Sequence, residues 1–301
     1  MKEVICGDVL QELPKIGRGV VNCCVTSPPY WNLRDYHADG QIGNEKTVDG
    51  YIQRIKTVFG AVYDVLSEDG TLWLNMGDTY KAKEMLGIPW RVAFALMEEG
   101  WILRQDIVWR KPNAMPENVL DRFTKSHEYI FLFTKSKKYF FDHEEALEPV
   151  KSDKGCSGTF RGGTYVNGKT KDNSAVQERT YRGNVRYGGK KYTENPDIFN
   201  RTKSGSLYTP RDKRNMRDVW DIATAGYKEA HFATFPYKIP ELCIRCGCPK
   251  NGVVLDPFAG SGTTLEAARN LGRGYIGIEI NPEYVKLIEK RLEKPEQVGM
   301  G

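Results

Sequence analysis

The fold is decided by residues 252–279, GVVLDPFAGSGTTLEAARNLGRGYIGIE. The segment starts with the β-rich run Gly252 to Leu255, passes through the turn Asp256 to Thr264 into a helical pattern, and reaches a second strand, Tyr275 to Ile278, followed by Glu279. A strand, a glycine-containing turn, a helix and a strand that ends in an acid form a mononucleotide-binding βαβ unit. The segment therefore predicts part of a mostly parallel sheet covered by helices.

The turn of this unit has the features of a small-molecule site. Gly260 and Gly262 let backbone N–H groups approach a ligand closely at the amino end of the helix. Glu279 can accept both hydroxyls of a ribose, and Asp256 is placed to meet a cationic amino group. Leu265 stands where a dinucleotide fingerprint has its third glycine, and no phosphate-loop lysine follows. A Gly-Ser-Gly turn alone could equally be a tight strand-to-helix connection, but the flanking acids favour a ligand with a ribose and no phosphate.

The same alternation of strands and helices extends over the rest of the chain, apart from one region. Periodicity predicts strands at Val4 to Cys6, Val20 to Thr26, Thr71 to Asn75, Trp101 to Trp109 and Glu128 to Thr134, and helices at Tyr51 to Leu66, Ile88 to Glu99, Pro240 to Cys246 and Pro282 to Leu292. From Lys151 to about Pro210, nine glycines and many polar residues follow no period. This region is predicted to be an insert or a small subdomain.

The insert is also where positive charge gathers. Between Lys151 and Trp220 there are 16 Lys and Arg against 7 Asp and Glu, whereas the whole chain carries a net charge of only +5. The remainder of the chain is therefore mildly acidic. A basic segment in an otherwise mildly acidic chain indicates either a polyanion-binding surface or a solvated loop.

Composition excludes several classes of protein. With 301 residues and 40% hydrophobic content the chain can bury a sizeable core, and no apolar run approaches the roughly 20 residues of a membrane span. Met1 to Asp8 contains no apolar secretion segment, so we expect a cytoplasmic protein with its seven cysteines reduced. Cys243, Cys246 and Cys248 lack an obvious fourth ligand, which favours helix packing over zinc, and no metal is predicted.

A second chemical signal is Ser27-Pro28-Pro29-Tyr30, directly after a predicted strand. Two consecutive prolines force the chain out of the sheet. The Ser27 hydroxyl and the Pro28 carbonyl can accept both N–H bonds of a planar amine while Tyr30 stacks on its ring. The amine lone pair then leaves conjugation and can attack a sulfonium methyl. For a double proline alone, a stiffened turn with a core aromatic is the simpler interpretation.

In combination and order, these motifs resemble those of the amino-group DNA methyltransferases of the N4-cytosine and N6-adenine type, in the permuted (beta) class where the catalytic motif precedes the cofactor motif. The matching stretches are Gly7-Asp8, Thr26 to Trp31, Asn75 to Tyr80, Lys111 to Asn113 through His127 to Tyr129, His231 to Pro236, and Asp256 to Thr264 with Glu279. The resemblance implies a Rossmann-like α/β fold, a seven-stranded mostly parallel sheet with one antiparallel strand built from both chain ends. It also implies S-adenosyl-L-methionine as cofactor and double-stranded DNA as partner.

The resemblance further implies how the chain is divided and which residues act. Residues 1–150 would form the catalytic half of the methyltransferase domain, residues 151–215 a basic target-recognition insert, and residues 216–301 the cofactor-binding half. The implied catalytic residues are Ser27, Pro28, Pro29 and Tyr30. The expected cofactor-binding residues are Asp8, Ser27, Thr234, Phe235, Pro236, Asp256, Pro257, Phe258, Ala259, Gly260, Ser261, Gly262, Thr263, Glu279 and Ile280. The expected DNA-binding residues are Arg161, Arg182, Arg186, Arg201, Arg211 and Arg214.

Residues and resemblance together predict a site-specific DNA methyltransferase that acts on an exocyclic amine of a flipped-out nucleotide. Ser27 stands where many adenine enzymes have Asp, which favours cytosine N4 over adenine N6. The alternatives are an RNA or protein-amide N-methyltransferase, which usually carries the cofactor motif first, and an inactive DNA-binding relative. A cognate restriction endonuclease is a candidate partner, and the choice between monomer and homodimer stays open.

Overall fold

The computed structural model describes residues 1–33, 40–149, 213–224 and 235–293. The chain divides into two compact units, of which the first comprises Met1–Ala146 with Arg217–Gly301 and the second Leu147–Met216. Both chain ends therefore build the first unit. In the second unit the described residues form β8 (Leu147–Pro149) and β9 (Lys213–Asn215), an antiparallel pair.

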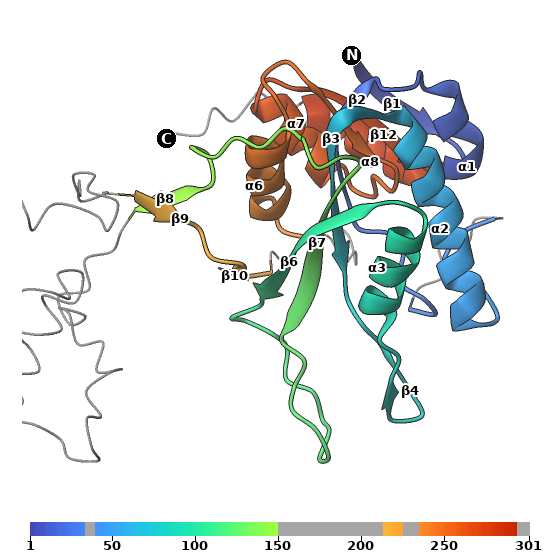
Figure 1. Ribbon diagram of the computed structural model, residues 1–301. Coiled ribbons are helices and arrows are strands. Elements are labelled where there is room, and N and C mark those ends of the chain that lie inside the picture. Colours follow the sequence, from blue (N-terminus) through green and yellow to red (C-terminus); the bar gives the residue numbers. More distant parts are fainter. Residues whose placement is uncertain (34–39, 150–212, 225–234, 294–301) are drawn as a thin grey trace, which may run out of the picture. The chain divides into compact units, whose positions relative to one another are not determined.

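The first unit is built on an eight-stranded sheet with the order β1-β12-β11-β2-β3-β7-β6-β10 (Figure 1). Its strands are β1 (Lys2–Cys6), β2 (Val21–Thr26), β3 (Leu66–Met76), β6 (Ile102–Arg110), β7 (His127–Thr134), β10 (Val219–Asp221), β11 (Val253–Asp256) and β12 (Gly274–Glu279). β7 is antiparallel to both of its neighbours, and every other adjacent pair is parallel. The predicted mostly parallel sheet with one antiparallel strand is confirmed. The eighth strand is the short edge strand β10, which is too short to show a period in the sequence.

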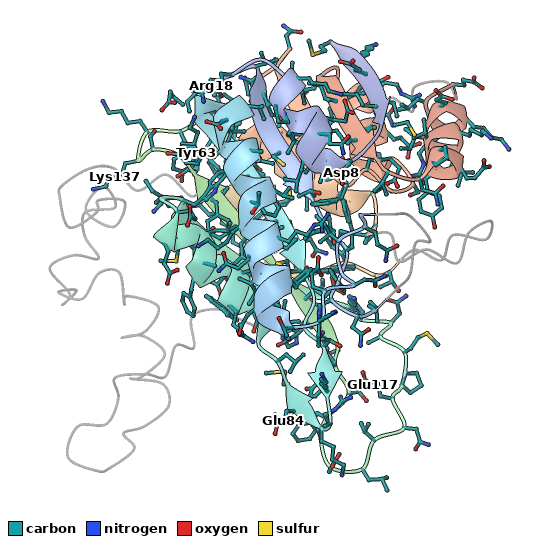
Figure 2. The ribbon with its side chains drawn as sticks, turned by 90° about the vertical axis from the view of Figure 1, so that its right-hand side faces the viewer. Asp8, Arg18, Tyr63, Glu84, Glu117 and Lys137 are labelled. Atoms are coloured by element: carbon teal, nitrogen blue, oxygen red, sulfur yellow. The ribbon has the colours of Figure 1, made fainter. Side chains whose placement is uncertain are left out.

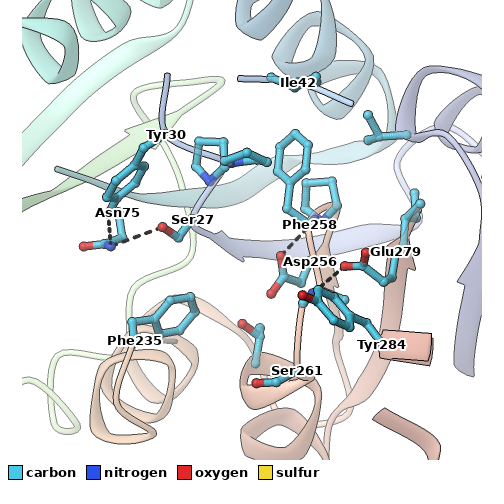
Figure 3. Close-up of a pocket in the computed structure, with 18 of the residues that line it drawn as sticks. Ser27, Tyr30, Ile42, Asn75, Phe235, Asp256, Phe258, Ser261, Glu279 and Tyr284 are labelled. Atoms are coloured by element: carbon cyan, nitrogen blue, oxygen red, sulfur yellow. Dashed lines mark hydrogen bonds between the residues drawn. The ribbon is translucent and has the colours of Figure 1, made fainter. Parts of the chain in front are cut away.

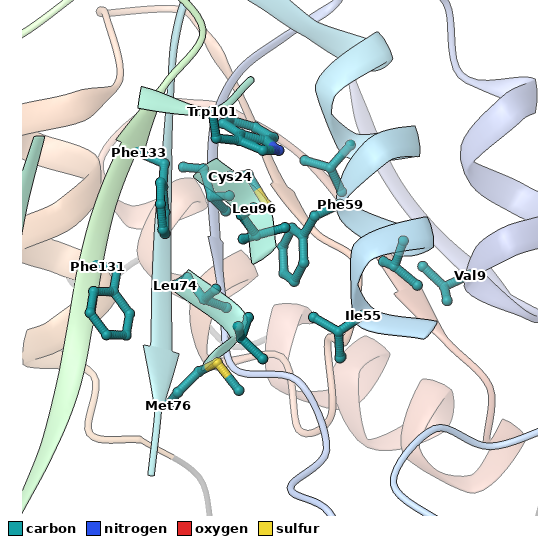
Figure 4. Packing of buried hydrophobic residues seen from close by; sticks show 14 of the residues in the cluster. Val9, Cys24, Ile55, Phe59, Leu74, Met76, Leu96, Trp101, Phe131 and Phe133 are labelled. Carbon is teal, nitrogen blue, oxygen red and sulfur yellow. The ribbon is translucent and has the colours of Figure 1, made fainter. Parts of the chain in front are cut away.

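Helices cover both faces of this sheet. One face packs against α1 (Val9–Glu12), the 3-10 turn Leu13–Lys15, α2 (Val48–Val65) and α3 (Ile88–Glu98), and the other against α6 (Lys238–Gly247), α7 (Thr263–Asn270) and α8 (Pro282–Glu293). Because strand side chains alternate, Cys24 joins the α2 core while its neighbours Cys23 and Val25 join the α6 core. Figure 4 shows the α2 core, with Ile55 and Phe59 facing the sheet.

The start of the longest helix, α2, follows from a local sequence signal, whereas the start of the strand after it does not. Thr47 caps it, since the Gly50 N–H donates to Thr47 Oγ1 at 3.0 Å. The predicted strand starts at Thr71, yet β3 already begins at Leu66, directly after the helix. Leu66 pairs with Val21, and a register shift before Cys23 accommodates the residues in between. The polar turn signal in this stretch is thus a bulged part of the strand.

A hairpin of β4 (Tyr80–Lys81) and β5 (Glu84–Met85) follows β3, and periodicity does not predict it. Figure 2 shows Glu84 of this hairpin and Glu117 of the β6–β7 loop at the same end of the unit, away from Arg18 and Lys137. None of the helices within the described ranges is long and apolar enough to cross a lipid bilayer.

The strand order places a switch point between β11 and β2. From β11 the chain continues to β12 on one side, and from β2 to β3 on the other. The carboxyl ends of these two parallel strands, Asp256 and Thr26, therefore lie side by side where the following segments diverge. In open α/β sheets this is the place where ligands bind.

Candidate active site

A cavity of about 350 Å³ opens at this switch point (Figure 3). Figure 3 shows Ser27, Tyr30, Asn75 and Phe235 on one side of it, and Asp256, Phe258, Glu279 and Tyr284 on the other. The predicted catalytic loop and the predicted cofactor turn, which lie more than 200 residues apart in the sequence, thus share one cavity.

A direct hydrogen bond joins the two halves of the site. The Thr26 hydroxyl donates to Asp256 Oδ1 at 2.7 Å, and the Phe258 N–H donates to the same oxygen at 3.1 Å. Asp256 is only 2% exposed, and burial raises the pKa of its carboxyl to about 6 in spite of these bonds. A cation at this end of the cavity would favour the ionised carboxylate.

Glu279 shapes the neighbouring part of the cavity. Its Oε2 accepts the Gly260 N–H at 2.8 Å and its Oε1 accepts the Asn281 N–H at 2.9 Å. Burial raises the pKa of Glu279 to about 7. Each carboxylate oxygen has a further lone pair, so the side chain can still accept hydroxyl groups from a ligand.

Gly262 contributes to the turn without lining the cavity. It caps α7 with φ +80°, and a Cβ there would meet Ile288 at 3.0 Å. Glycine at this position lets the chain turn from β11 into α7 while α8 packs closely against it. The conformation of the turn then aims the Gly260 N–H at Glu279.

The catalytic half of the cavity is organised by Asn75 at the end of β3. Its Nδ2 donates to Ser27 Oγ at 3.3 Å, to Tyr30 Oη at 3.2 Å and to Glu128 Oε2 at 3.0 Å. The Tyr30 phenol donates to Glu128 Oε2 at 2.7 Å. Since an ionised carboxylate only accepts, Glu128 fixes the Asn75 amide with its nitrogen toward Ser27.

Glu128 in turn forms an ion pair with Lys111, whose ammonium lies 4.4 Å from the centroid of the Trp109 ring. Burial raises the pKa of Glu128, but the Lys111 charge and the hydrogen bonds from Tyr30 and Asn75 outweigh it, and the net pKa is lowered. Burial, followed by the Glu128 charge, raises the pKa of Tyr30 well above its usual value. The network therefore holds an ionised Glu128 carboxylate beside a neutral Tyr30 phenol at neutral pH.

The loop that carries Ser27 is anchored from behind. The Tyr51 phenol on α2 donates to the Pro29 carbonyl at 2.9 Å, and the buried Trp31 donates its indole N–H to the Glu45 carbonyl at 2.9 Å. These contacts hold the two prolines at the cavity while β2 ends behind them. The loop is thus positioned by the Tyr51 side chain of α2 and by the backbone carbonyl of Glu45.

Most predicted site residues line this cavity: Asp8, Ser27, Pro28, Pro29, Tyr30, Phe235, Asp256, Pro257, Phe258, Ala259, Gly260, Ser261, Thr263, Glu279 and Ile280. Gly262 and the buried Pro236 do not line it, and Thr234 lies outside the described residues. Of the predicted DNA-binding residues, Arg161, Arg182, Arg186, Arg201 and Arg211 also lie outside the described residues. Arg214, on β9 of the second unit, donates to Glu148 Oε1 at 2.8 Å.

The sequence gives no role to Asn75, Lys111 or Glu128, although all three fall within the motif stretches quoted above. Their places in these stretches could have marked the three residues as candidates, but the contacts among their side chains depend on how β3, β6 and β7 pair. Ile42 and Tyr284 also line the cavity, and no pattern marks them. Both come from segments that reach the site only through the tertiary fold.

In the part of the chain that the structure describes, no group of three or more His, Cys, Asp or Glu side chains is arranged to hold a metal. Cys243 and Cys246 lie in α6 and, like Cys248, are buried as free thiols in the core beside it. Burial raises the pKa of all three thiols. They are packing residues of α6 and the turn after it.

A switch-point cavity with two buried acids on one side and the Ser-Pro-Pro-Tyr loop on the other is the arrangement expected from the motifs for a methyltransferase of the amino-group type. The family model for DNA methylases of the N6/N4 type matches residues 21–290. The chain belongs to this DNA methylase family, which confirms the resemblance seen in the motifs.

Among known proteins the chain is similar to type II methyltransferases. It is 38% identical to M.XycI of Xanthomonas campestris pv. cyanopsidis, over 95% of this chain and 86% of that protein. It is 36% identical to M.SmaI of Serratia marcescens, over 96% of this chain and 90% of that protein. Both comparisons span most of the length of both proteins.

Solved structures share the fold at lower identity. The PvuII DNA methyltransferase, described as cytosine-N4-specific, matches with a TM-score of 0.65 and 19% identity over 96% of this chain and 85% of that one. The complex of M1.HpyAVI with SAM matches with a TM-score of 0.57 and 18% identity over 98% and 100%. Both likenesses support the Rossmann-like architecture described above.

Proposed function

We propose that this DNA methyltransferase transfers a methyl group from S-adenosyl-L-methionine to the exocyclic amine of a flipped-out base in double-stranded DNA, with cytosine N4 as the preferred target. The observation that carries the proposal is the Thr26–Asp256 hydrogen bond, because it holds the amine-gripping loop beside the acidic turn in one cavity. The type II methyltransferases that cover nearly the whole chain support the same activity.

The residues on the acidic side fit this cofactor. Burial raises the pKa of the Asp256 carboxyl, and the cationic amino group of the cofactor would stabilise its ionised form. Glu279 keeps free lone pairs for the two ribose hydroxyls, and Phe258 offers an apolar surface beside them. When bound, the cofactor supplies a methyl group on a positively charged sulfonium.

The residues on the other side prepare the base amine. Ser27 Oγ accepts the Asn75 amide and also hydrogen-bonds Tyr30, which leaves a lone pair for one N–H of the amine. The Pro28 carbonyl accepts the second N–H, so the nitrogen lone pair points away from the ring plane. Tyr30 is held by Glu128 and presents its ring for stacking. Ser27 and Pro28 thus hold the base amine and Tyr30 the base ring, while Pro29, whose carbonyl accepts the Tyr51 phenol, stiffens the loop that carries them.

We further propose that residues 151–215 form the target-recognition insert between the two halves of the methyltransferase domain, with Arg161, Arg182, Arg186, Arg201, Arg211 and Arg214 among its DNA contacts. The charge balance of this stretch supports the assignment, because phosphate contacts supply most of the affinity of DNA-binding proteins. A cognate restriction endonuclease belongs to the same proposal, since M.XycI and M.SmaI are named type II methyltransferases.

The test is to express the chain in a host that lacks its own DNA methylation. Nucleoside mass spectrometry of the host DNA should show N4-methylcytosine, and sequencing that detects modified bases should place it at one sequence. N6-methyladenine instead would keep the activity and overturn the choice of base. The Ser27→Ala variant serves as the control, and the absence of both modified bases with the wild-type chain would refute the proposed function.

A further inference from the structure

The loop that joins β6 to β7, residues 111–126, carries apolar side chains in water. Leu120, Phe123 and Met115 are 100%, 97% and 84% exposed, more than any other large apolar side chain in the described ranges. All three lie within one short loop, and apolar surface concentrated in this way favours a site that a partner covers.

The loop is held in shape by polar contacts. The Lys111 N–H donates to the Ser126 carbonyl at 2.8 Å and closes its base. Within the loop, Glu117 accepts from the Arg122 guanidinium and from the Lys125 N–H. The scaffold therefore displays Leu120 and Phe123, instead of letting them collapse onto the sheet.

The neighbouring β4–β5 hairpin supports the loop from the side. Lys83 pairs with Asp121 at 2.7 Å, and the Arg122 guanidinium lies 4.1 Å from the centroid of the Tyr80 ring. Lys125 donates its ammonium to the Asp78 carbonyl. The two segments extend together from the carboxyl-end edge of the parallel strands (Figure 1).

The loop is also continuous with the base-binding end of the cavity. It starts at Lys111 and ends just before Glu128, and both side chains line the cavity beside Tyr30. A base that enters the cavity must leave a gap in the duplex next to this opening.

We propose that Phe123 and Leu120 insert into the DNA duplex beside the target nucleotide and fill the space that the flipped base leaves. The inference rests on the proposed function and deepens it. The gap between the flanking base pairs is flat, apolar and aromatic, which suits a phenyl ring and a leucine side chain. Apolar wedges between base steps are a known way for proteins to stabilise unstacked DNA.

The experiment compares the Leu120→Ala/Phe123→Ala double variant with the wild type and with Met97→Ala. Met97 is a 45% exposed apolar residue at the end of α3, and the nine-residue strand β6 separates it from the loop. The substrates are two synthetic duplexes with the sequence mapped in the host, in which the target nucleotide is either correctly paired or opposite a mismatched base. Melting temperature and calorimetric affinity for S-adenosyl-L-methionine should be the same in all three proteins.

On the paired duplex the double variant should lose about tenfold or more in kcat/KM, whereas Met97→Ala should match the wild type. On the mismatched duplex the loss should shrink to about threefold or less, because a mispaired base costs less to flip. An equal loss on both duplexes would overturn the inference and leave an ordinary DNA contact. An unchanged rate of the double variant on both duplexes would overturn it as well. So would a sedimentation coefficient lower for the double variant than for the wild type, because the loop would then bind a second copy of the chain. Failure of the wild type on both duplexes would instead refute the proposed function.

Discussion

The contacts of Glu279 predict by how much the Glu279→Gln substitution should weaken binding of the cofactor. Both oxygens of Glu279 accept backbone N–H groups, at 2.8 Å from Gly260 and 2.9 Å from Asn281, and they also face the expected ribose. Glutamine keeps the shape but replaces one acceptor with a donor and removes the charge. A hydrogen bond to a charged group contributes about 1.5–3 kcal/mol, so we expect cofactor affinity to fall about 10- to 150-fold.

The pH dependence gives the prediction a second readout. In the ligand-free chain, burial raises the pKa of Glu279 to about 7 and that of Asp256 to about 6. Since the ligand is expected to bind the ionised carboxylates, Glu279 must release its proton first, and affinity should weaken by about tenfold per pH unit between pH 7 and 6 and more steeply below pH 6, where Asp256 is protonated as well. In Glu279→Gln this decline should begin only below about pH 6, where Asp256 takes up its proton.

The measurement is isothermal titration of S-adenosyl-L-methionine between pH 5 and 8, with Glu283→Gln as the matched control. Glu283 is an exposed acid in the first turn of α8, and its side chain pairs with Lys286 instead of facing the cavity. The control should keep wild-type affinity at every pH. A Glu279→Gln variant with wild-type affinity, or with a wild-type pH profile, would refute the role of Glu279.

Protein stability provides a check on this experiment. Because burial raises the pKa of Glu279 above its usual value, the folded chain loses stability as pH rises from about 4.5 toward 7, where the unfolded state ionises first. The neutral glutamine removes this destabilisation. The glutamine NH2 must, however, face the N–H of Gly260 or Asn281, so the two effects oppose each other and the ligand-free variant should melt close to the wild type at pH 8. Titrations carried out well below that melting temperature then separate weaker binding from unfolding.

Four further changes test other parts of the molecule. Ser27→Ala should lower methyl transfer about 100-fold in a tritiated-methyl assay while calorimetric cofactor affinity stays unchanged, and a parallel loss of affinity would contradict its role at the base. Glu128→Gln removes the partner of the half-buried Lys111, so urea unfolding should show a loss on the order of 2 kcal/mol together with reduced turnover. Gly262→Ala forces a Cβ into a positive-φ position against α8 and should cost about 1–2 kcal/mol, read as a lower melting temperature. Deletion of Lys151 to Pro210 should abolish the shift of DNA in a gel and spare cofactor titration, and retained sequence-specific methylation would refute the assignment of the insert.

Local periodicity was sufficient for most of the fold. β11, α7 and β12 were predicted from residues 252–279 because their burial pattern and their glycines are local properties of the chain. The short β4–β5 hairpin and the edge strand β10 were not predicted, since two or three residues cannot show a period of two. Their formation depends on contacts with segments that already have a structure.

Site residues could be predicted from the sequence only where several of them are consecutive in the chain. Ser27 to Tyr30 and Asp256 to Gly260 are continuous motifs, and their side chains line the cavity. The Thr26–Asp256 bond that joins them depends on β2 lying next to β11, which the order of motifs implies but no local pattern contains. The motifs therefore predicted the two halves of the site, and the resemblance supplied their juxtaposition.

The Asn75–Glu128 contact shows what limits such predictions. Asn75 pairs with Ile130 across the antiparallel β3–β7 ladder, and Glu128, two residues from Ile130, therefore projects from the same face of the sheet. A register shift of one residue would move Glu128 to the opposite face and leave both Asn75 and Tyr30 without its carboxylate. Strand register is set by the whole apolar pattern of β3, β6 and β7, so the position of this one acid is a property of the assembled sheet. The residues that hold Ser27 in place for chemistry are thus fixed by the same packing that builds the core.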